Sequence, residues 1–275
     1  MPELPEVETV RRGLEVRLVG KVIEGVKIYH NNIIVGISVE DFSSSIINQR
    51  INRMARYGKW LIFVLDDYYL LSHLRMEGKY FFRSSLEELN KHEHVVFSLD
   101  DGTELRYMDV RKFGKMWLIK KEDIRSTGPL IEMGLEPWDS NLCLNYLKDK
   151  FKSKRLPIKT VLLDQSIIVG IGNIYANEIL YLSGINPLKK ASLVSDKEID
   201  DIIKYTKEVL DKAIEAGGTT FRSYSSVDGV HGLFQRELYV HSKEGEKCSK
   251  CNSLIEQIKV GGRGTYYCPN CQKID

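Results

Sequence analysis

The stretch CSKCNSLIEQIKVGGRGTYYCPNC, residues 248–271, decides the fold of the C-terminal end of this 275-residue chain. It holds two C-x-x-C pairs, Cys248 with Cys251 and Cys268 with Cys271, and sixteen residues separate the pairs. Each pair lets two sulfurs face one metal from a tight turn, and this spacing is typical of a four-thiolate zinc site. Because four protein ligands leave no open position for a catalytic water, we expect one zinc ion with a structural role.

The hairpin between the two pairs carries basic residues at its turn. Lys259 precedes the turn, and Arg263 stands between Gly262 and Gly264. Glycines allow a close approach of the backbone, and an arginine at a hairpin tip suits a phosphate or a base edge. A solvated surface arginine is the alternative, and this segment alone does not decide between them.

Cysteine usage also bounds the compartment. The fifth cysteine, Cys143, stands alone, and the N-terminus MPELPEVETVRRGLEV carries early acids and no apolar core of a secretory signal. In such a chain, paired cysteines indicate metal binding rather than disulfides. No apolar run approaches the ~20 residues needed to span a bilayer. We therefore expect a cytoplasmic protein.

Overall charge gives weak guidance on partners. Hydrophobic residues make up 43% and charged residues 28% of the chain, which is ordinary for a soluble globular protein. The formal net charge is only +2, with a pI near 8.1. A nucleic-acid partner must therefore be argued from where the charges lie.

Upstream of the cysteines, residues 140–216 show helical periodicity. The strings LCLNYLKDKF, TVLLD, YANEILYLSG and EIDDIIKYTKEVLDKAIEAGG carry apolar residues at helical spacing or a glycine stop. The segment 220–240 is polar and contains glycines, which favours a loop. A break rich in Gly and Pro, STGPLIEMGLEPWD, precedes the helices and indicates a domain boundary.

The N-terminal part has a different texture. Residues 2–19 are predicted to form an amphipathic helix ending at Gly20. From residue 21 to about 120, short β-branched and aromatic runs alternate with turn signals, namely VIEGVKIY, WLIFVL, YYLLSHL, GKYFF, HVVFSL, ELRYMD and KMWLIK. Seven or so strands at close spacing predict an antiparallel sandwich or barrel.

The first residues could act as a reagent. A small residue after the initiator Met usually permits removal of Met1, which would leave Pro2 with a secondary amine. Attack of that amine on an aldehyde-level carbon would give an iminium ion, a good electron sink. Glu3 and Glu6 lie close enough in sequence for proton transfer. The alternative is that Pro2 and Pro5 merely begin a helix and that Glu3, Glu6 and Glu8 favour its positive end.

Six strings, read with the cysteines, resemble bacterial formamidopyrimidine-DNA glycosylase. They occur in the family's order and are PELPEVETVRRGL, HLRMEGKY, DVRKFG, DQSIIVGIGNIYANEIL, GGTTFRSY and VGGRGTYYCPNCQ. The resemblance implies a multidomain α+β fold: an N-terminal helix with a two-sheet β-sandwich, a helical domain with a helix–two-turns–helix motif, and a four-cysteine zinc finger. We expect their boundaries at 2–130, 131–140 for the hinge, 141–235 and 236–273.

The resemblance also implies an activity. It is the excision of oxidised purines, chiefly 8-oxoguanine and formamidopyrimidines, from damaged double-stranded DNA, followed by β,δ-elimination at the abasic site. Pro2 would attack the sugar C1′, Glu3 would protonate the sugar ring or shuttle protons, and Lys59 would donate a proton near the damage. Arg263 joins this catalytic group as a contact to the lesion phosphate.

Further roles follow position by position from the same resemblance. Met76, Arg111 and Phe113 match residues that fill the hole left by a flipped base. The implied DNA contacts are completed by His73, Lys159 and Asn173. Lesion recognition is implied for Glu6, Glu77, Thr219, Thr220, Phe221, Arg222 and Tyr224.

Two features depart from or add to the family pattern. The family usually shows Tyr-Gly-Arg where this chain has His241-Ser242-Lys243, which leaves one phosphate contact in doubt. The run LKDKFKSKRLPIK, residues 147–159, is basic and fits a DNA-facing stretch or a solvated face equally well.

Two alternatives remain at this point. The sibling family of oxidised-pyrimidine glycosylases, endonuclease VIII, shares the proline and the finger, but its start usually has Gly where Leu4 stands here. A zinc-ribbon protein that only binds DNA would need no Pro2-Glu3 start. One enzyme on one lesion needs only a monomer, so we expect one.

Overall fold

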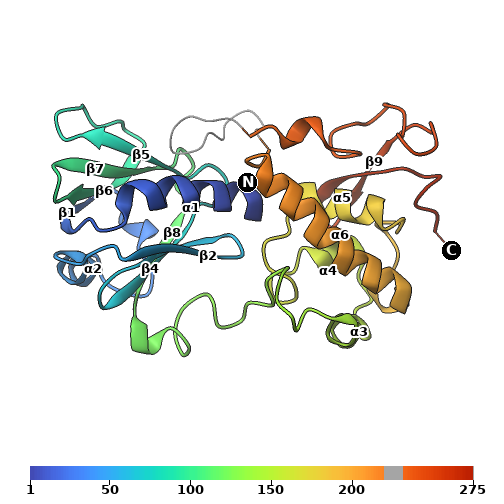
Figure 1. Cartoon of the computed structure of the whole chain (residues 1–275), viewed down its shortest axis with the longest axis horizontal. Helices are drawn as coiled ribbons and strands as arrows, with labels where there is room; N and C mark the ends of the chain where they lie inside the picture. The colour runs from blue at the N-terminus through green and yellow to red at the C-terminus, as the bar shows by residue number, and fades with distance from the viewer. Residues whose placement is uncertain (220–231, 275) are drawn as a thin grey trace. The chain divides into compact units, whose positions relative to one another are not determined.

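The computed structural model describes residues 1–219 and 232–274, and the chain divides into two compact units. Unit 1 comprises Met1–Glu132 with Gly217–Gly232, and unit 2 comprises Met133–Ala216 with Leu233–Asp275. The sequence places a hinge at 131–140, close to the point where unit 1 gives way to unit 2. In Figure 1 the strands of unit 1 are coloured blue to green, and the helices and C-terminal hairpin of unit 2 run from yellow-green to red.

Unit 1 contains two antiparallel sheets. One has the strand order β1-β6-β7-β5, with bounds Ile23–Ile28, Glu93–Leu99, Thr103–Met108 and Lys79–Ser84. The other has the order β2-β3-β4-β8, with bounds Arg53–Tyr57, Trp60–Val64, Tyr68–His73 and Lys115–Lys120. The chain crosses from one sheet to the other three times, between β1 and β2, between β4 and β5, and between β7 and β8.

Helix α1 (Leu4–Leu18) supplies one side of the core of unit 1. Its apolar residues repeat at helical spacing, and Val7, Val10, Leu14 and Leu18 are all buried in one cluster with side chains of both sheets. The helix begins after Glu3, with Pro5 in its first turn, where a missing N–H costs nothing. The predicted N-terminal helix is confirmed, and the two antiparallel sheets confirm the predicted β-sandwich.

Short elements complete unit 1. Helix α2 (Val39–Ile46) begins at Ser38, whose side chain accepts a hydrogen bond from Asp41 N, and it buries Phe42 and Ile46. There are also two 3₁₀ turns. One, η1 (Asn31–Ile33), lies between β1 and α2, and the other, η2 (Lys121–Asp123), follows β8.

Unit 2 is helical up to the cysteine module. Its α-helices are α3 (Leu144–Phe151), α4 (Ile158–Leu162), α5 (Asn173–Leu182) and α6 (Asp196–Glu215), and its 3₁₀ turns are η3 (Ala191–Leu193) and η4 (Phe234–Arg236). Helix α6 begins with a capping box between Ser195 and Glu198. Within the residues described, no helix is long and apolar enough to cross a membrane.

The C-terminal module is a hairpin of β9 (Glu256–Val260) and β10 (Arg263–Tyr267), flanked by the two cysteine pairs. Its small apolar cluster joins Val240, Ile255, Cys248 and Cys268 to Tyr181 of α5. A module this small has little apolar area to bury, so contacts with α5 and a bound metal must hold it.

Candidate functional site

The first residues of the chain are buried at the head of α1. Pro2 is buried, Glu3 is only 3% exposed, and Met1 is half exposed. Glu6 Oε2 accepts a hydrogen bond from Glu3 N at 2.8 Å, while Glu6 Oε1 accepts from Thr219 N at 2.7 Å and Thr219 Oγ1 at 3.0 Å. One carboxylate therefore fixes the backbone of residue 3 and that of Thr219.

The chemistry available at this end depends on the state of Pro2. Removal of Met1 would turn the Pro2 nitrogen from an amide into a secondary amine. That amine would lie at the N-terminal end of α1, next to Glu3, and could act as a nucleophile in its unprotonated form. Glu3 is the neighbouring group that can exchange a proton.

The third acid of this helix has a structural role. Glu8 forms ion pairs with Arg11, Arg12 and Arg56. Burial opposes its ionisation, but the hydrogen bonds from Arg11 and Arg12 outweigh that effect and lower the pKa of Glu8. Glu8 is therefore paired with its arginines, whereas Glu6 is bonded to Glu3 N and to Thr219.

Lys59 directly precedes β3, and His73 ends β4, the neighbouring strand of the same sheet. Lys59 occupies the tight turn between β2 and β3, is 6% exposed, and follows Gly58, whose φ is +54°. His73 ends β4, pairs in register with Trp60 and packs edge-on against its ring at 4.7 Å. The pKa of His73 falls to about 3, because burial and then the positive charges of Arg75 and Lys59 disfavour imidazolium.

A hydrogen bond sets the tautomer of His73. Its Nδ1 accepts from Arg75 N at 3.0 Å, so the neutral ring carries its proton on Nε2. His73 thus offers one directional N–H donor rather than a mobile charge, which suits a contact to a phosphate oxygen.

Met76, Arg111 and Phe113 are exposed on two loops of unit 1. Met76 lies between β4 and β5 and is 39% exposed, and Phe113 lies between β7 and β8 and is 49% exposed. The guanidinium of Arg111 stacks 4.9 Å from the centre of the Phe113 ring. Glu77 is half-buried beside Met76. Large apolar side chains held in solvent in this way suggest a surface that meets a partner.

The Arg111–Phe113 loop is held by Asp109. This aspartate is fully buried; its Oδ1 accepts from Arg111 N at 3.0 Å, and its Oδ2 accepts from Gly114 N at 2.8 Å. Such a turn, in which a side chain bonds its own backbone two residues on, is a usual task of aspartate. Sequence reasoning assigns Asp109 no role, although an aspartate before a turn in the string DVRKFG is a signal that could reveal one.

The two loops share one buried contact. A Cβ built on Gly78 would lie 2.3 Å from the hydroxyl of Tyr107, and one built on Gly114 would lie 1.7 Å from the same atom. Gly78 closes the Met76 loop, and Gly114 closes the Arg111–Phe113 loop. Tyr107 is fully buried, so its ring cannot move aside. Only glycine at both positions allows this tyrosine to pin the loops together.

We expect Gly114→Ala to destabilise unit 1 by about 1–3 kcal/mol, because the methyl group overpacks a rigid ring. Thermal unfolding measures this loss. Gly25→Ala is the control, since its Cβ would meet Ser98 at an ordinary 3.7 Å. Adding Tyr107→Phe should recover part of the loss; equal stability of the Gly114→Ala and Gly25→Ala variants would contradict the account.

In unit 2, Asn173 contacts the hairpin at Gly264, the residue after Arg263. Asn173 begins α5, and Gly172 before it supplies no capping side chain. Asn173 Nδ2 donates to Gly264 O at 3.1 Å, next to the exposed Arg263. A helix start and an arginine side by side can hold a phosphate.

Lys159 of α4 lies beneath this pair. It is fully buried, and its Nζ donates to Gly264 O at 3.0 Å and to Thr265 Oγ1 at 2.6 Å. In this structure it supports the strand that carries Arg263. Its predicted contact with phosphate stays a prediction.

The four cysteine sulfurs form a cluster in which all ligand atoms lie within 4.8 Å of one another. Cys248 Sγ lies 3.8 Å from Cys271 Sγ, and Cys251 Sγ lies 3.4 Å from Cys268 Sγ. Tetrahedral bonds of about 2.3 Å to zinc place sulfurs about 3.8 Å apart. The residues therefore fit one zinc ion, and the predicted structural zinc is confirmed by this donor set and by the family match given below.

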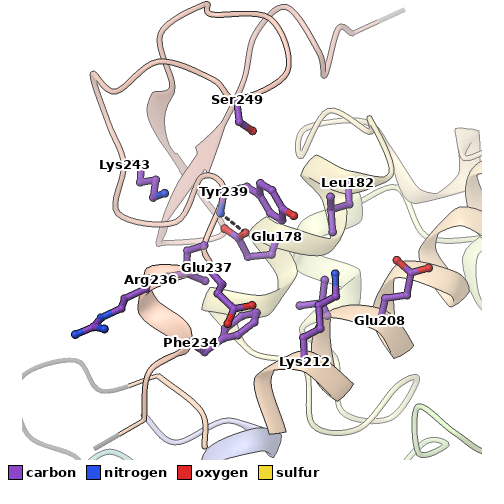
Figure 2. Close-up of a pocket in the computed structure, with 12 residues that line it drawn as sticks. Glu178, Leu182, Glu208, Lys212, Phe234, Arg236, Glu237, Tyr239, Lys243 and Ser249 are labelled. Carbon is purple, nitrogen blue, oxygen red and sulfur yellow. Dashed lines mark hydrogen bonds between the residues drawn. The ribbon is translucent and has the colours of Figure 1, made fainter. Parts of the chain in front are cut away.

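A cavity of about 390 Å³ lies elsewhere in unit 2, against α5 and α6 (Figure 2). None of the described candidate residues lines it. Glu178 at its wall accepts from Tyr239 N, Val240 N and His241 N at 2.6–3.0 Å. Burial raises the pKa of Glu178, and the three N–H donors oppose that rise. Glu178 thus ties the chain leading to the zinc module onto α5, a role that sequence reasoning missed.

The segment His241-Ser242-Lys243, which departs from the family pattern, takes part in this contact with α5. His241 Nδ1 lies 2.7 Å from Asn177 Nδ2, and its ring packs edge-on against Tyr266. Burial, followed by the charge of Lys159, lowers the pKa of His241 to about 4. Ser242 adopts a φ of +63°, a conformation that glycine takes more readily.

The structure bears on two further predictions, those for the basic run 147–159 and for the lesion-recognition residues. Lysines of the basic run pair with acids, Lys148 with Asp196 and Lys154 with Asp164, which favours a solvated face. Of the predicted lesion-recognition residues, Thr219 contacts Glu6, whereas Thr220, Phe221, Arg222 and Tyr224 lie outside the described residues.

Comparison with known proteins covers the whole chain. The profile of the formamidopyrimidine-DNA glycosylase N-terminal domain matches residues 1–116, that of its H2TH domain matches 133–225, and that of a zinc finger found in FPG and IleRS matches 245–274. The chain is 48% identical over 275 residues to a formamidopyrimidine-DNA glycosylase of Exiguobacterium sibiricum, covering 100% of this chain and 99% of the relative. It is 45% identical to that of Bacillus subtilis, covering 99% of each.

Solved structures of Fpg proteins are similar to this chain over nearly its whole length. The Fpg of Lactococcus lactis in complex with DNA containing an abasic site has a TM-score of 0.92 and 38% identity, covering 99% of this chain and 100% of the other. The same protein bound to DNA containing an oxidised pyrimidine has a TM-score of 0.91 at the same identity and coverage.

Proposed function

Because the chain belongs to the formamidopyrimidine-DNA glycosylase family, we propose that it removes oxidised purines, chiefly 8-oxoguanine and formamidopyrimidines, from duplex DNA. It is a DNA glycosylase of base excision repair with one structural zinc. The proposal covers its lesion class, its nucleophile and the roles of its residues.

The observation that carries the proposal is the buried start of the chain. Glu3 and Glu6 surround it, and Glu6 bonds both residue 3 and Thr219. The freed Pro2 nitrogen attacks C1′, a new N–C1′ bond forms, and the glycosidic bond breaks with its electrons leaving on the base. Glu3 supplies the proton that the sugar oxygen or the departing base needs.

The resulting iminium drives the later steps. The attacking nitrogen loses its proton, the protonated ring oxygen O4′ leaves C1′, and the opened sugar is joined to Pro2 as an iminium. The iminium withdraws electrons from C1′ and makes the C2′ proton acidic, so that loss of this proton expels the 3′ phosphate; a second elimination expels the 5′ phosphate. Pro2 is thereby joined to the DNA in an intermediate that a reductant can trap.

Unit 1 also supplies groups that can replace an extruded base. Extrusion costs a few kcal/mol. An unbranched Met76, a planar Arg111 and the Phe113 ring can recover part of the lost stacking and pairing. In unit 2, Asn173 and Arg263 would hold phosphate, with Lys159 supporting them. The zinc supplies no chemistry and folds the module that presents Arg263.

The function is tested by trapping and by substrate choice. Borohydride should link the protein to a duplex containing 8-oxoguanine opposite cytosine, and mass spectrometry should map the link to residue 2. The same digest reports whether Met1 has been removed. Excision is compared on a thymine-glycol duplex; preference for that duplex would favour the endonuclease VIII alternative. Absence of any adduct would favour a protein that only binds DNA.

The partner and setting follow from this chemistry. A single lesion engages a single N-terminus, so we propose that the protein acts as a monomer on damaged double-stranded DNA. The relatives named above are bacterial, and we propose that the protein works in the bacterial cytoplasm, associated with the nucleoid when bound to DNA.

A further inference from the structure

One face of helix α5 contacts the cysteine module along its whole length. Asn173, Asn177 and Tyr181 are spaced four residues apart, so they lie in one row on the helix. Asn173 Nδ2 bonds Gly264 O, Asn177 Nδ2 meets His241 Nδ1, and the hydroxyl of Tyr181 reaches Cys248 Sγ at 3.2 Å. The row that starts at the candidate phosphate site therefore ends at a metal ligand.

Tyr181 is held firmly in this position. It is fully buried, and its ring stacks on Tyr239 at 5.6 Å. Lys250 Nζ lies 4.6 Å from the centre of the same ring. The hydroxyl also lies 3.1 Å from Ser249 Oγ. The direction of the hydroxyl toward the sulfur is thus set by packing of Tyr239 and Lys250 against the ring and by a neighbouring hydroxyl.

The chemistry of a zinc thiolate fixes the direction of these hydrogen bonds. Cys248 binds zinc as a thiolate and has no proton to give. Tyr181 must therefore donate its single proton to Cys248 Sγ. The contact with Ser249 can then only run the other way, with Ser249 Oγ donating to the Tyr181 oxygen. The two hydroxyls form a relay that ends on the sulfur.

We propose that Tyr181 is a positioning residue for the zinc site, whose hydroxyl stabilises the Cys248 thiolate and makes retention of zinc depend on helix α5. A charge-assisted hydrogen bond to a ligand orients it and withdraws charge from it. Loss of such a partner typically costs 10- to 100-fold in metal affinity. This inference depends on the zinc site and not on the glycosylase chemistry.

The test compares zinc release from the full-length holoprotein and its variants in excess chromogenic chelator. Tyr181→Phe should release zinc about 10-fold faster, and Ser249→Ala should give a smaller increase in the same direction. Tyr267→Phe is the matched control. It removes a tyrosine hydroxyl next to Cys268, but that hydroxyl bonds Glu256 Oε2 at 2.8 Å instead of a sulfur.

A spectroscopic readout separates a hydrogen bond to sulfur from a general loosening of the module. In cobalt-substituted protein, loss of a donor to the thiolate should shift the sulfur-to-metal charge-transfer band of Tyr181→Phe to longer wavelength, with the wild-type band kept in Tyr267→Phe. Equal release rates for the two tyrosine variants, or an unshifted band in Tyr181→Phe, would overturn the proposal. Neither readout involves DNA, so failure here is distinguishable from failure of the proposed function.

Discussion

Glu3→Gln is expected to slow excision of 8-oxoguanine by about 10²- to 10⁴-fold, the range that general acid–base groups usually contribute. The amide has nearly the same shape as the carboxyl group but cannot deliver or take up a proton. The backbone N–H of residue 3 still donates to Glu6 Oε2, so the start of the chain should keep its place. Single-turnover kinetics on a lesion duplex measure the loss.

Binding and a matched variant complete this test. Affinity for the lesion duplex, measured by fluorescence anisotropy, should stay within a few-fold of wild type, because phosphate contacts are attributed to other residues. Glu24→Gln is the control, since Glu24 is exposed on β1 and away from the N-terminus in sequence. Normal turnover by Glu3→Gln would exclude proton transfer by Glu3.

Cys268→Ser is expected to weaken duplex binding by roughly 10- to 100-fold while unit 1 stays folded. Cys268 is fully buried and is one of the four zinc ligands. Loss of a ligand removes folding free energy from the module. The module then no longer presents Arg263, and one lost charge-assisted hydrogen bond of about 1.5–3 kcal/mol corresponds to this fall in affinity.

The measurements are zinc content, duplex affinity and the thermal unfolding profile of the same preparations. Cys143→Ser is the control, because Cys143 is an exposed cysteine outside the cluster. Unchanged affinity in a Cys268→Ser protein that has lost its zinc would mean that the module does not hold DNA.

Sequence periodicity predicted most secondary structure because most of it is local. The runs assigned as strands correspond to β1 and to β3–β8, and the helical strings correspond to α3–α6. Strand β2 was missed because its residues, RMARY, do not alternate between apolar and polar, and it is half-buried at the sheet edge. Helix α2 was missed because its eight residues, rich in serine, are too few for a clear period.

The residues of the site also divide into those that the sequence reveals and those whose contacts depend on tertiary packing. The zinc ligands could be recognised from spacing alone, and the Pro2-Glu3 start could be recognised by resemblance. The bond between Glu6 and Thr219 joins residues 213 positions apart, and no local pattern encodes it. The same holds for Tyr181 and Cys248, because the face of α5 that meets the module depends on tertiary packing. Asp109 and Glu178 were missed because their partners are backbone N–H groups, which every sequence has.

The shared contact of Tyr107 with Gly78 and Gly114 limits the substitutions that relatives of this protein can accept at these positions. A relative could not acquire a bulkier residue at Gly114 without a compensating change in Tyr107. A bulkier residue at Gly78 would in addition have to clear the backbone oxygen of Leu74, which lies 2.6 Å from the added Cβ, so substitutions at these positions must occur together. Grafting one of the two loops from another repair enzyme should therefore fail unless its companion and the tyrosine are transplanted together.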